Sequence, residues 1–280
     1  MIRKLALGIL FAMIATAAVA QKAGVGAWEN PSYTILEWIE DAPALGWYYN
    51  WRTDQIWHEG GQRRSVEFVP MIHGASEIND RIDSTLRVRA LLGFNEPDGP
   101  GSHQSGLSPE QAAALWPQLE ARGLRLGSPA TTQGGTLGRN SWQRKFMNLA
   151  EARGLRVDFM AVHYYSRDGD VGAFKAWLEA VYAEYRRPIW VTEFAFIDWG
   201  NPGRATHARN AAFAEASIVM MERLPFVERH AWFAANPYPW QGATPEVNLL
   251  DNDLRLTAVG EAFERALRRA SSLQVADAGR

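Results

Sequence analysis

The sequence predicts an α/β protein with a single domain, a (β/α)₈ TIM barrel, and three observations favour that fold. Short apolar runs alternate with helical segments along the chain. The string EARGLR occurs at 120–125 and again at 151–156, an offset of 31 residues that fits one strand and its crossover helix. About 260 residues would hold about eight such units, and eight units are enough to close a barrel.

The expected strands are apolar runs bounded by glycine, proline or polar residues. In order, they lie at 24–28, 45–51, 66–73, 90–95, 125–130, 158–165, 188–194 and 229–235. Two segments between them carry helix signals. In the first, 108–123, Ser108 and Gln111 can form a capping box and Gly123 can end the helix. The second, 168–187, begins at an aspartate and keeps its apolar residues on one face.

A doubly wound open sheet is the alternative arrangement of these elements. It usually needs fewer strands and a phosphate-binding loop. The string GVGAWE at 24–29 lacks the third glycine of a dinucleotide fingerprint, so the closed barrel is favoured.

Both ends of the chain are expected to lie outside the domain, which would span 21–270. Residues 1–20 begin with Arg3 and Lys4, continue through an apolar stretch and end in small residues, the pattern of a secretory signal peptide. An uncleaved anchor is the alternative, and after cleavage no membrane span is expected. Residues 271–280 are small and polar, so we expect a disordered tail.

Composition excludes several classes of function. Loss of the leader lowers Lys plus Arg from 29 to 27 against 31 acidic residues, and no basic run occurs, so no nucleic-acid partner is expected. The chain has no cysteine and therefore no thiol nucleophile or thiolate metal site. Its six histidines form no HxH or HExxH spacing, so neither a metal nor another cofactor is expected.

Two glutamates stand at the ends of expected strands. In LLGFNEPDGP, at 91–100, an apolar strand runs into Asn95 and Glu96 and is stopped by Pro97. Glu193 lies 97 residues later in PIWVTEFA, close to three units of the period, which places the pair on strands four and seven of one barrel mouth. Paired carboxylates across a groove fit glycoside hydrolysis, in which one is an acid with a raised pKa and the other stays ionised. The alternative is that each glutamate makes a helix cap or a salt bridge.

The strings LLGFNEPD, VEFVPM and WVTEFA resemble glycoside hydrolase family 128, bacterial and fungal endo-β-1,3-glucanases within the retaining (β/α)₈ clan. The resemblance covers roughly residues 24–265. It implies that Glu96 is the acid/base, that Glu193 is the nucleophile and that Asn95 holds the sugar 2-hydroxyl.

Further residues are expected to line the mouth. His163 and Tyr165 share one face of their strand and could bond Glu193 and keep it ionised, although a core histidine and tyrosine are the alternative. Indoles stack on sugar rings, so the tryptophans at strand ends are candidate subsites. The substrate-binding candidates are Trp28, Trp51 and Trp232, with Asn50 and His73 beside them and Trp199 and Trp240 in later loops. Asp98 and the loop 131–140 could border the groove, whereas Trp116 and Trp177 are expected in the core.

The sequence thus predicts a secreted or periplasmic, monomeric endo-β-1,3-glucanase whose partner is a β-glucan. Another β-glycan, such as a mannan, a xylan or a mixed-linkage glucan, is the alternative substrate. A barrel that binds glycan without cleaving it is the alternative of a different class, and a metal-dependent hydrolase is a more distant one.

Overall fold

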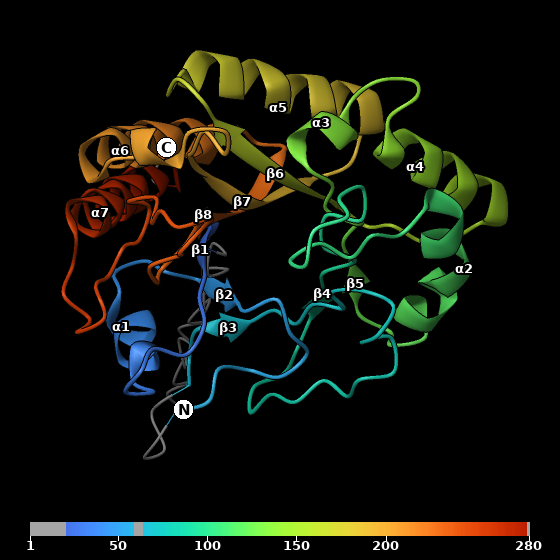
Figure 1. Cartoon of the computed structure of the whole chain (residues 1–280), viewed down its shortest axis with the longest axis horizontal. Helices are drawn as coiled ribbons and strands as arrows, with labels where there is room; N and C mark the ends of the chain where they lie inside the picture. The colour runs from blue at the N-terminus through green and yellow to red at the C-terminus, as the bar shows by residue number, and fades with distance from the viewer. Residues whose placement is uncertain (1–20, 59–63, 279–280) are drawn as a thin grey trace, which may run out of the picture.

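The computed structural model describes residues 21–58 and 64–278, and within them eight parallel strands surround one axis (Figure 1). They are β1 (Ala23–Gly26), β2 (Trp47–Tyr49), β3 (Glu67–Phe68), β4 (Ala90–Leu91), β5 (Arg125–Leu126), β6 (Met160–Ser166), β7 (Ile189–Phe196) and β8 (Val227–Phe233). Each one overlaps an expected strand. Several are shorter than expected, because regular pairing at β3, β4 and β5 lasts for two residues.

Pairing between neighbouring strands closes the ring. A six-stranded sheet has the order β3-β2-β1-β8-β7-β6, and β4 pairs with β5. Two bridges join these sheets, Met71 with Leu92 between β3 and β4 and Gly127 with Phe159 between β5 and β6. The amide of Ile72 also donates to the carbonyl of Leu92 at 3.1 Å. The barrel prediction is therefore confirmed, and the open sheet is excluded.

Helices cover the barrel unevenly (Figure 1). They are α1 (Ile35–Asp41), α2 (Pro109–Glu120), α3 (Gln133–Thr136), α4 (Trp142–Arg153), α5 (Val171–Tyr185), α6 (His207–Glu222) and α7 (Ala258–Ala278), with a 3₁₀ turn η1 (Pro202–Arg204). Within the described ranges, loops without a helix connect β2 to β3 and β3 to β4. In the described part of the chain, a helix thus follows every strand except β2 and β3.

The helix boundaries follow from local chemistry. Ser108 caps α2 by accepting from the amide of Gln111, whose side chain accepts from the Ser108 amide, the expected capping box. Asp170 caps α5 in the same position. Gly123 and Gly154, the glycines of the repeated string, have φ of 70° and 65°, a backbone conformation that favours glycine.

Aromatic side chains fill the barrel interior near the N-terminal ends of the strands. Trp47, Phe159 and Trp190 are fully buried there, and the rings of Phe159 and Trp190 stack with centroids 4.0 Å apart. Gly24 makes room for this layer, since a Cβ at that position would lie 2.4 Å from the Trp47 ring. The barrel is therefore a packed core, and open space is left at the C-terminal ends of its strands.

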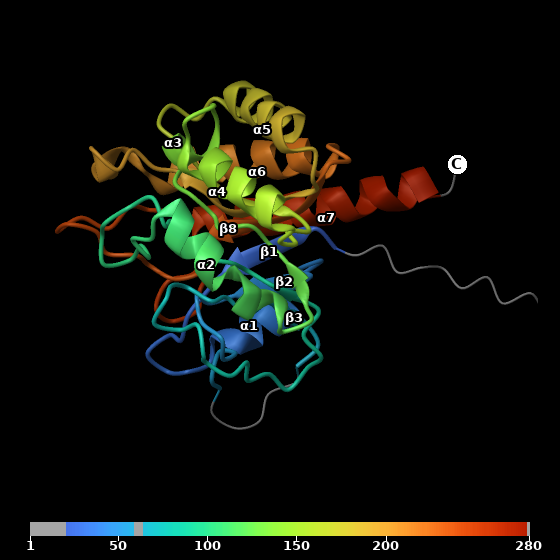
Figure 2. The ribbon, with the colours of Figure 1, turned by 90° about the vertical axis from the view of Figure 1, so that its right-hand side faces the viewer.

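The sequence analysis expects a disordered tail from residue 271, whereas α7 continues to Ala278 and projects beyond the barrel (Figure 2). Residues 271–278 contain no glycine or proline, so nothing in their sequence ends the helix. The expected signal peptide at 1–20 lies outside the described residues. Within those residues, no helix combines the length and the apolar character that crossing a bilayer requires.

Candidate active site

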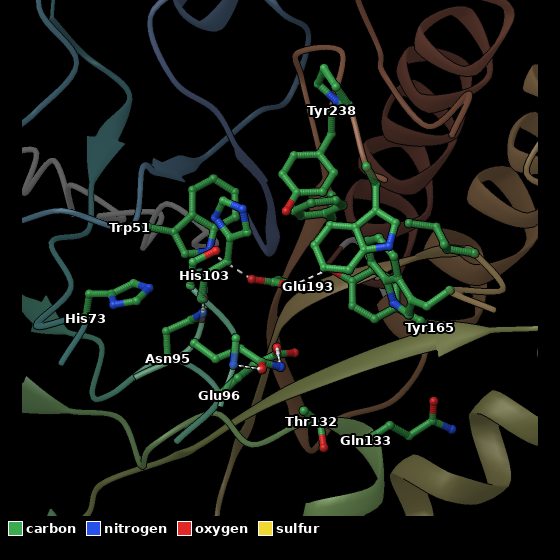
Figure 3. Close-up of a pocket in the computed structure, with 18 of the residues that line it drawn as sticks. Trp51, His73, Asn95, Glu96, His103, Thr132, Gln133, Tyr165, Glu193 and Tyr238 are labelled. Carbon is green, nitrogen blue, oxygen red and sulfur yellow. Dashed lines mark hydrogen bonds between the residues drawn. The ribbon is translucent and has the colours of Figure 1, made fainter. Parts of the chain in front are cut away.

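A cavity of about 1020 Å³ opens at the C-terminal ends of the barrel strands (Figure 3). Glu96 and Glu193 both line it, and they approach each other from β4 and β7. One oxygen of each carboxylate lies within 4.8 Å of the other and of a His163 ring nitrogen. The structure thus brings together the two glutamates that the sequence places on facing strands.

The position of Glu96 depends on how β4 ends. Its backbone φ is 38°, in the left-handed region, which costs a residue with a side chain about 1–2 kcal/mol. Backbone bonds hold it there, because the Asn95 amide donates to His73 at 2.9 Å and the Glu96 amide donates to Ala130 at 2.7 Å. Pro97 then prevents further pairing. The strand therefore stops where the carboxylate turns into the cavity.

The position of Glu193 depends on an irregularity in β7. Val191 pairs with Val162 of β6, whereas the next residue of β6, His163, pairs with Glu193, so the register shifts by one residue at this point. With regular alternation, Glu193 would share the outward face of Val191. The shift instead turns Glu193 into the mouth, a common use of a β-bulge beside an active site.

All four carboxylate oxygens accept hydrogen bonds from the protein. Glu193 accepts from Trp51 Nε1 at 2.8 Å on one oxygen and from the Tyr165 hydroxyl on the other. Glu96 accepts from Gln104 Nε2 at 2.8 Å, and its second oxygen lies 2.9 Å from His163 Nδ1. His163 Nδ1 is also 3.3 Å from Glu193, so this buried imidazole lies between the two acids.

Burial is the largest influence on both carboxyl groups and raises the pKa of each, but the outcomes differ. For Glu96, the hydrogen bond and charge of His163, with the Gln104 amide, outweigh burial and hold its pKa below the ordinary value. For Glu193, burial and the negative charge of Glu96 prevail, and its pKa is raised. Burial lowers the pKa of His163, but the two carboxylates outweigh it and the net pKa is raised.

This order of the two carboxyl pKa values is the reverse of the sequence expectation, in which Glu96 has the raised pKa and Glu193 stays ionised. The physical reason is the position of His163. Its Nδ1 lies closer to Glu96 than to Glu193, so its charge stabilises the ionised form of Glu96 more strongly.

The same three side chains are the one group in the described part of the chain that could surround a cation. Every oxygen of that group, however, already faces an N–H or O–H donor of the protein. Such donors compete with a cation for the same lone pairs. These hydrogen bonds therefore favour two carboxyl groups that act directly on a substrate over two that ligate a metal ion.

Aromatic rings form one wall of the cavity. Trp28 lies 5.9 Å from Trp51 and 6.2 Å from Tyr238, measured between ring centroids. Farther along, Trp199 lies 5.1 Å from Trp240. Of the tryptophans expected in the groove, the structure thus places Trp28, Trp51, Trp199 and Trp240 in it.

The prediction for Trp232 is wrong. Its ring is fully buried, its indole donates to the Val247 carbonyl at 2.8 Å, and it packs against Phe194 between the barrel and the helices. Strand alternation explains this, because it turns the next residue, Phe233, into the cavity. The prediction for Asn50 is also wrong, since its buried amide bonds backbone atoms of Arg52 and Asp54 and shapes the loop after β2.

The other expected residues lie near the carboxylates. His73 lines the cavity, and burial lowers its pKa, which favours the neutral imidazole. The side-chain amide of Asn95 donates to the His103 carbonyl at 3.0 Å. The buried side-chain oxygen of Asn95, Oδ1, has no partner among the described residues. Asp98 bonds the amide and hydroxyl of Thr132 and thus ties the loop 131–140 to the end of β4.

The two tryptophans assigned to helical patterns differ in burial. Trp116 is fully buried, as expected, and Trp177 packs against the core while remaining partly accessible. Tyr164, on the opposite strand face from His163, stacks on Phe174 of α5 at 4.1 Å.

The sequence analysis did not identify several residues that line the cavity, above all Gln104, His103 and Tyr238. Gln104 lies in GPGSHQSG, a run rich in glycine and serine directly after the Glu96 motif, and that composition is the signal for a loop at the site. Tyr238 lies in NPYPW after β8, where two prolines indicate a rigid turn.

Comparison with known proteins agrees with this geometry. A family model described as Glycosyl hydrolase catalytic core matches residues 26–263, so the chain belongs to that family and is a glycoside hydrolase. More narrowly, it is a member of glycoside hydrolase family 128. A subgroup I endo-β-1,3-glucanase of that family from Amycolatopsis mediterranei, solved with laminarihexaose, is 34% identical, with a TM-score of 0.73 over 88% of this chain and 99% of that one.

More distant relatives share the domain. A subgroup V exo-β-1,3-glucanase from Cryptococcus neoformans is 26% identical, with a TM-score of 0.71 over 88% of this chain and 99% of that one. Alkali-sensitive linkage protein 1 of Schizosaccharomyces pombe is 26% identical over 224 residues, which are 78% of this chain. The match spans 40% of that curated relative's length.

Proposed function

We propose that the protein is a retaining endo-β-1,3-glucanase in which Glu193 is the nucleophile and Glu96 is the acid/base. The observation that carries this proposal is the approach of the two carboxylates to within 4.8 Å. Retaining enzymes hold these groups about 5–5.5 Å apart, whereas inverting enzymes need about 6.5–9.5 Å to admit a water molecule. The subgroup I relative, described as an endo-β-1,3-glucanase, supports the substrate class and the endo action.

The reaction has two displacements. Glu193 attacks the anomeric carbon while the bond to the leaving oxygen breaks and Glu96 gives that oxygen its proton. A water molecule, which loses a proton to Glu96, then attacks the same carbon and releases Glu193. The hydrogen bonds from Trp51 and Tyr165 hold the Glu193 carboxylate in place for both steps.

His163 accounts for how Glu96 can act as an acid despite its low pKa in the free protein. The Nδ1 proton of a charged His163 points at Glu96 across 2.9 Å, so its transfer gives neutral imidazole and protonated Glu96. A sugar that fills the cavity excludes water, and a drier site disfavours the ion pair relative to the neutral pair. Binding of substrate thus prepares the acid.

Asn95 is suited to hold a sugar hydroxyl. Its side-chain amide is fixed by the bond to His103, which leaves the buried carbonyl oxygen without a partner among the described residues. A buried acceptor of this kind gains most when a ligand donor reaches it. The rings of Trp28, Trp51 and Phe233 offer apolar faces for the sugar rings nearby.

The proposal predicts that the protein releases reducing ends from laminarin or curdlan in the presence of EDTA, and that the first product is the β-anomer. Reducing-sugar assays and proton NMR of the anomeric signals measure these two outcomes. Cleavage of mannan, xylan or mixed-linkage glucan in place of laminarin would contradict the substrate, and an α-anomer would contradict the mechanism. Binding to curdlan without release of sugar would favour a glycan-binding barrel.

A second prediction concerns Gln104, whose amide helps to lower the pKa of Glu96. Gln104→Leu removes that donor, so the pKa of Glu96 rises and the acid keeps its proton to higher pH. The alkaline limb of kcat/KM should therefore move to higher pH, and kcat/KM at its optimum should fall roughly tenfold as Glu96 loses an orienting bond. Gln133→Leu is the matched control, because Gln133 lines the same cavity and its amide makes no bond to either carboxylate in the described structure. A limb that does not move in Gln104→Leu would contradict this role.

The assignments to export and to a monomer remain predictions. Export is expected from the leader-like residues 1–20. Purification from a periplasmic extract would test export, and sizing by light scattering would test the monomer.

A further inference from the structure

A second cavity, of about 330 Å³, lies beside the main one. Trp28 and Pro237 line both cavities, so the two are neighbours across this pair. Hydrogen bonds fix the boundary, since Asn236 accepts from the Trp28 amide at 3.1 Å and donates to the Trp28 carbonyl at 3.0 Å. A polymer that occupies the main cavity and extends past Trp28 would enter the second one.

An exposed aromatic pair stands at this second cavity. Among the described residues, the large apolar side chains with the greatest exposure are Trp57 at 56%, Tyr33 at 45% and Leu256 at 37%. Tyr33 lines the cavity and contacts Trp57 edge to face, with ring centroids 5.1 Å apart and planes 82° apart. Exposed aromatic rings that meet beside a cavity are a candidate platform for a ligand.

The backbone holds both rings in place. Tyr33 has a φ of 55°, a costly conformation for a bulky residue. Asn30 maintains it, because its carbonyl accepts from the Tyr33 amide at 2.9 Å and its side chain accepts from the amide of Thr34 at 2.7 Å. On the other loop, Glu29 accepts from the Trp57 amide at 3.0 Å. A strained residue that is kept exposed by a buried side chain indicates a function for its ring.

The chemistry of the second cavity suits a carbohydrate. Asn30, Asn236 and Asn252 line it together with Glu29, so polar groups surround the aromatic pair. Glu29 is already paired with Arg52 at 2.6 Å, which leaves no strong charge to attract an ion. Apolar ring faces beside neutral amides are typical of sites that bind sugar rings and their hydroxyls.

We propose that Tyr33 and Trp57 form a distal subsite that binds a glucose unit of a glucan chain extending past Trp28 from the main cavity. This inference rests on the proposed function. It implies that the two rings contribute to the use of long chains more than to the use of short ones.

The test compares laminarin with laminaritriose as substrates. Trp57→Ala and Tyr33→Gly should each lower the ratio of kcat/KM for laminarin to kcat/KM for laminaritriose by about threefold to tenfold. Glycine suits the left-handed backbone at position 33, so the second variant removes the ring and relieves strain. Tyr33→Phe and Trp57→Tyr keep a ring and should keep most of the ratio, and Leu256→Ala, at the third exposed apolar position, should not change it.

An unchanged ratio in both ring-deleting variants would overturn the subsite and leave the proposed function intact. An equal loss on both substrates would also overturn it, since that pattern indicates general damage. A wild-type protein that leaves laminarin and laminaritriose intact would overturn the proposed function and this inference with it.

Discussion

Glu193→Gln should lower kcat on laminarin by about 10³-fold or more, because an amide cannot act as the nucleophile. The side chain keeps its shape, and the oxygen that accepts from Trp51 can remain in place. The loss should therefore come from chemistry, and the melting temperature should stay close to that of the wild type. Initial rates of reducing-end release and a thermal melt measure the two quantities.

Glu228 provides a matched control for that variant. It is also a glutamate on a barrel strand, and it also accepts from an indole, Trp190 Nε1, at 2.8 Å. It lies near the start of β8, at the opposite end of the barrel from the cavity, where it also pairs with Arg125. Glu228→Gln should therefore retain activity, and similar losses in both variants would contradict a catalytic role for Glu193.

A small anion distinguishes the role of Glu193 from that of Glu96. Glu193→Ala leaves space on the α face of the bound sugar, and added azide can attack the anomeric carbon there while Glu96 protonates the leaving oxygen. The product should be an α-glycosyl azide, which the anomeric coupling constant in NMR identifies. Formation of the β-azide by this variant would indicate that Glu193 is not the nucleophile.

The sequence was sufficient to place the two glutamates on facing strands, because parallel strands in a barrel bring all their C-terminal ends to one mouth. The 31-residue repeat and the glycine caps gave the spacing of the units from β4 onward. The loops after β2 and β3 depart from that spacing, since they lack helices in the part of the chain that the structure describes. Periodicity therefore predicted the fold class better than its individual units.

Side-chain direction was harder to predict than strand position. Glu193 points inward because the register between β6 and β7 shifts by one residue, and no local pattern in the sequence marks that shift. The same uncertainty of one residue made Trp232 a candidate for the groove when Phe233 is the residue that lines it. Alternation fixes the face of each residue only once the register is known.

The partners of the carboxylates were only partly predictable. Tyr165 was expected to bond Glu193, and it does. His163 was expected to serve Glu193 alone, yet it lies between both acids and is closer to Glu96. Gln104 reaches Glu96 from a loop whose conformation depends on glycine, since a Cβ at Gly99 would lie 2.1 Å from the Gln104 side chain. Such contacts arise from the tertiary fold and leave little trace in the local sequence.

Glu96→Ala should affect substrates according to their leaving groups. On laminarin, whose leaving oxygen needs a proton, kcat should fall by about 10²-fold to 10⁴-fold. In a dinitrophenyl β-glycoside of a laminari-oligosaccharide, the leaving group is dinitrophenolate, which departs without that proton. Glu193 can therefore still form the covalent intermediate. Hydrolysis of this covalent intermediate is then slow, because the variant has no carboxylate at position 96 to activate water. A burst of dinitrophenol should therefore precede a slow steady state.

Added azide should accelerate that slow step, since an anion needs no general base. It attacks the intermediate from the side that water normally uses, displaces Glu193 and gives a β-glycosyl azide, the opposite anomer to that expected from Glu193→Ala. The alkaline limb of the pH profile should also disappear in Glu96→Ala on the activated substrate, because the group that must stay protonated is gone. An α-azide product, or an equal loss on both substrates, would contradict the assignment of Glu96 as the acid/base and would require the two carboxylates to exchange roles.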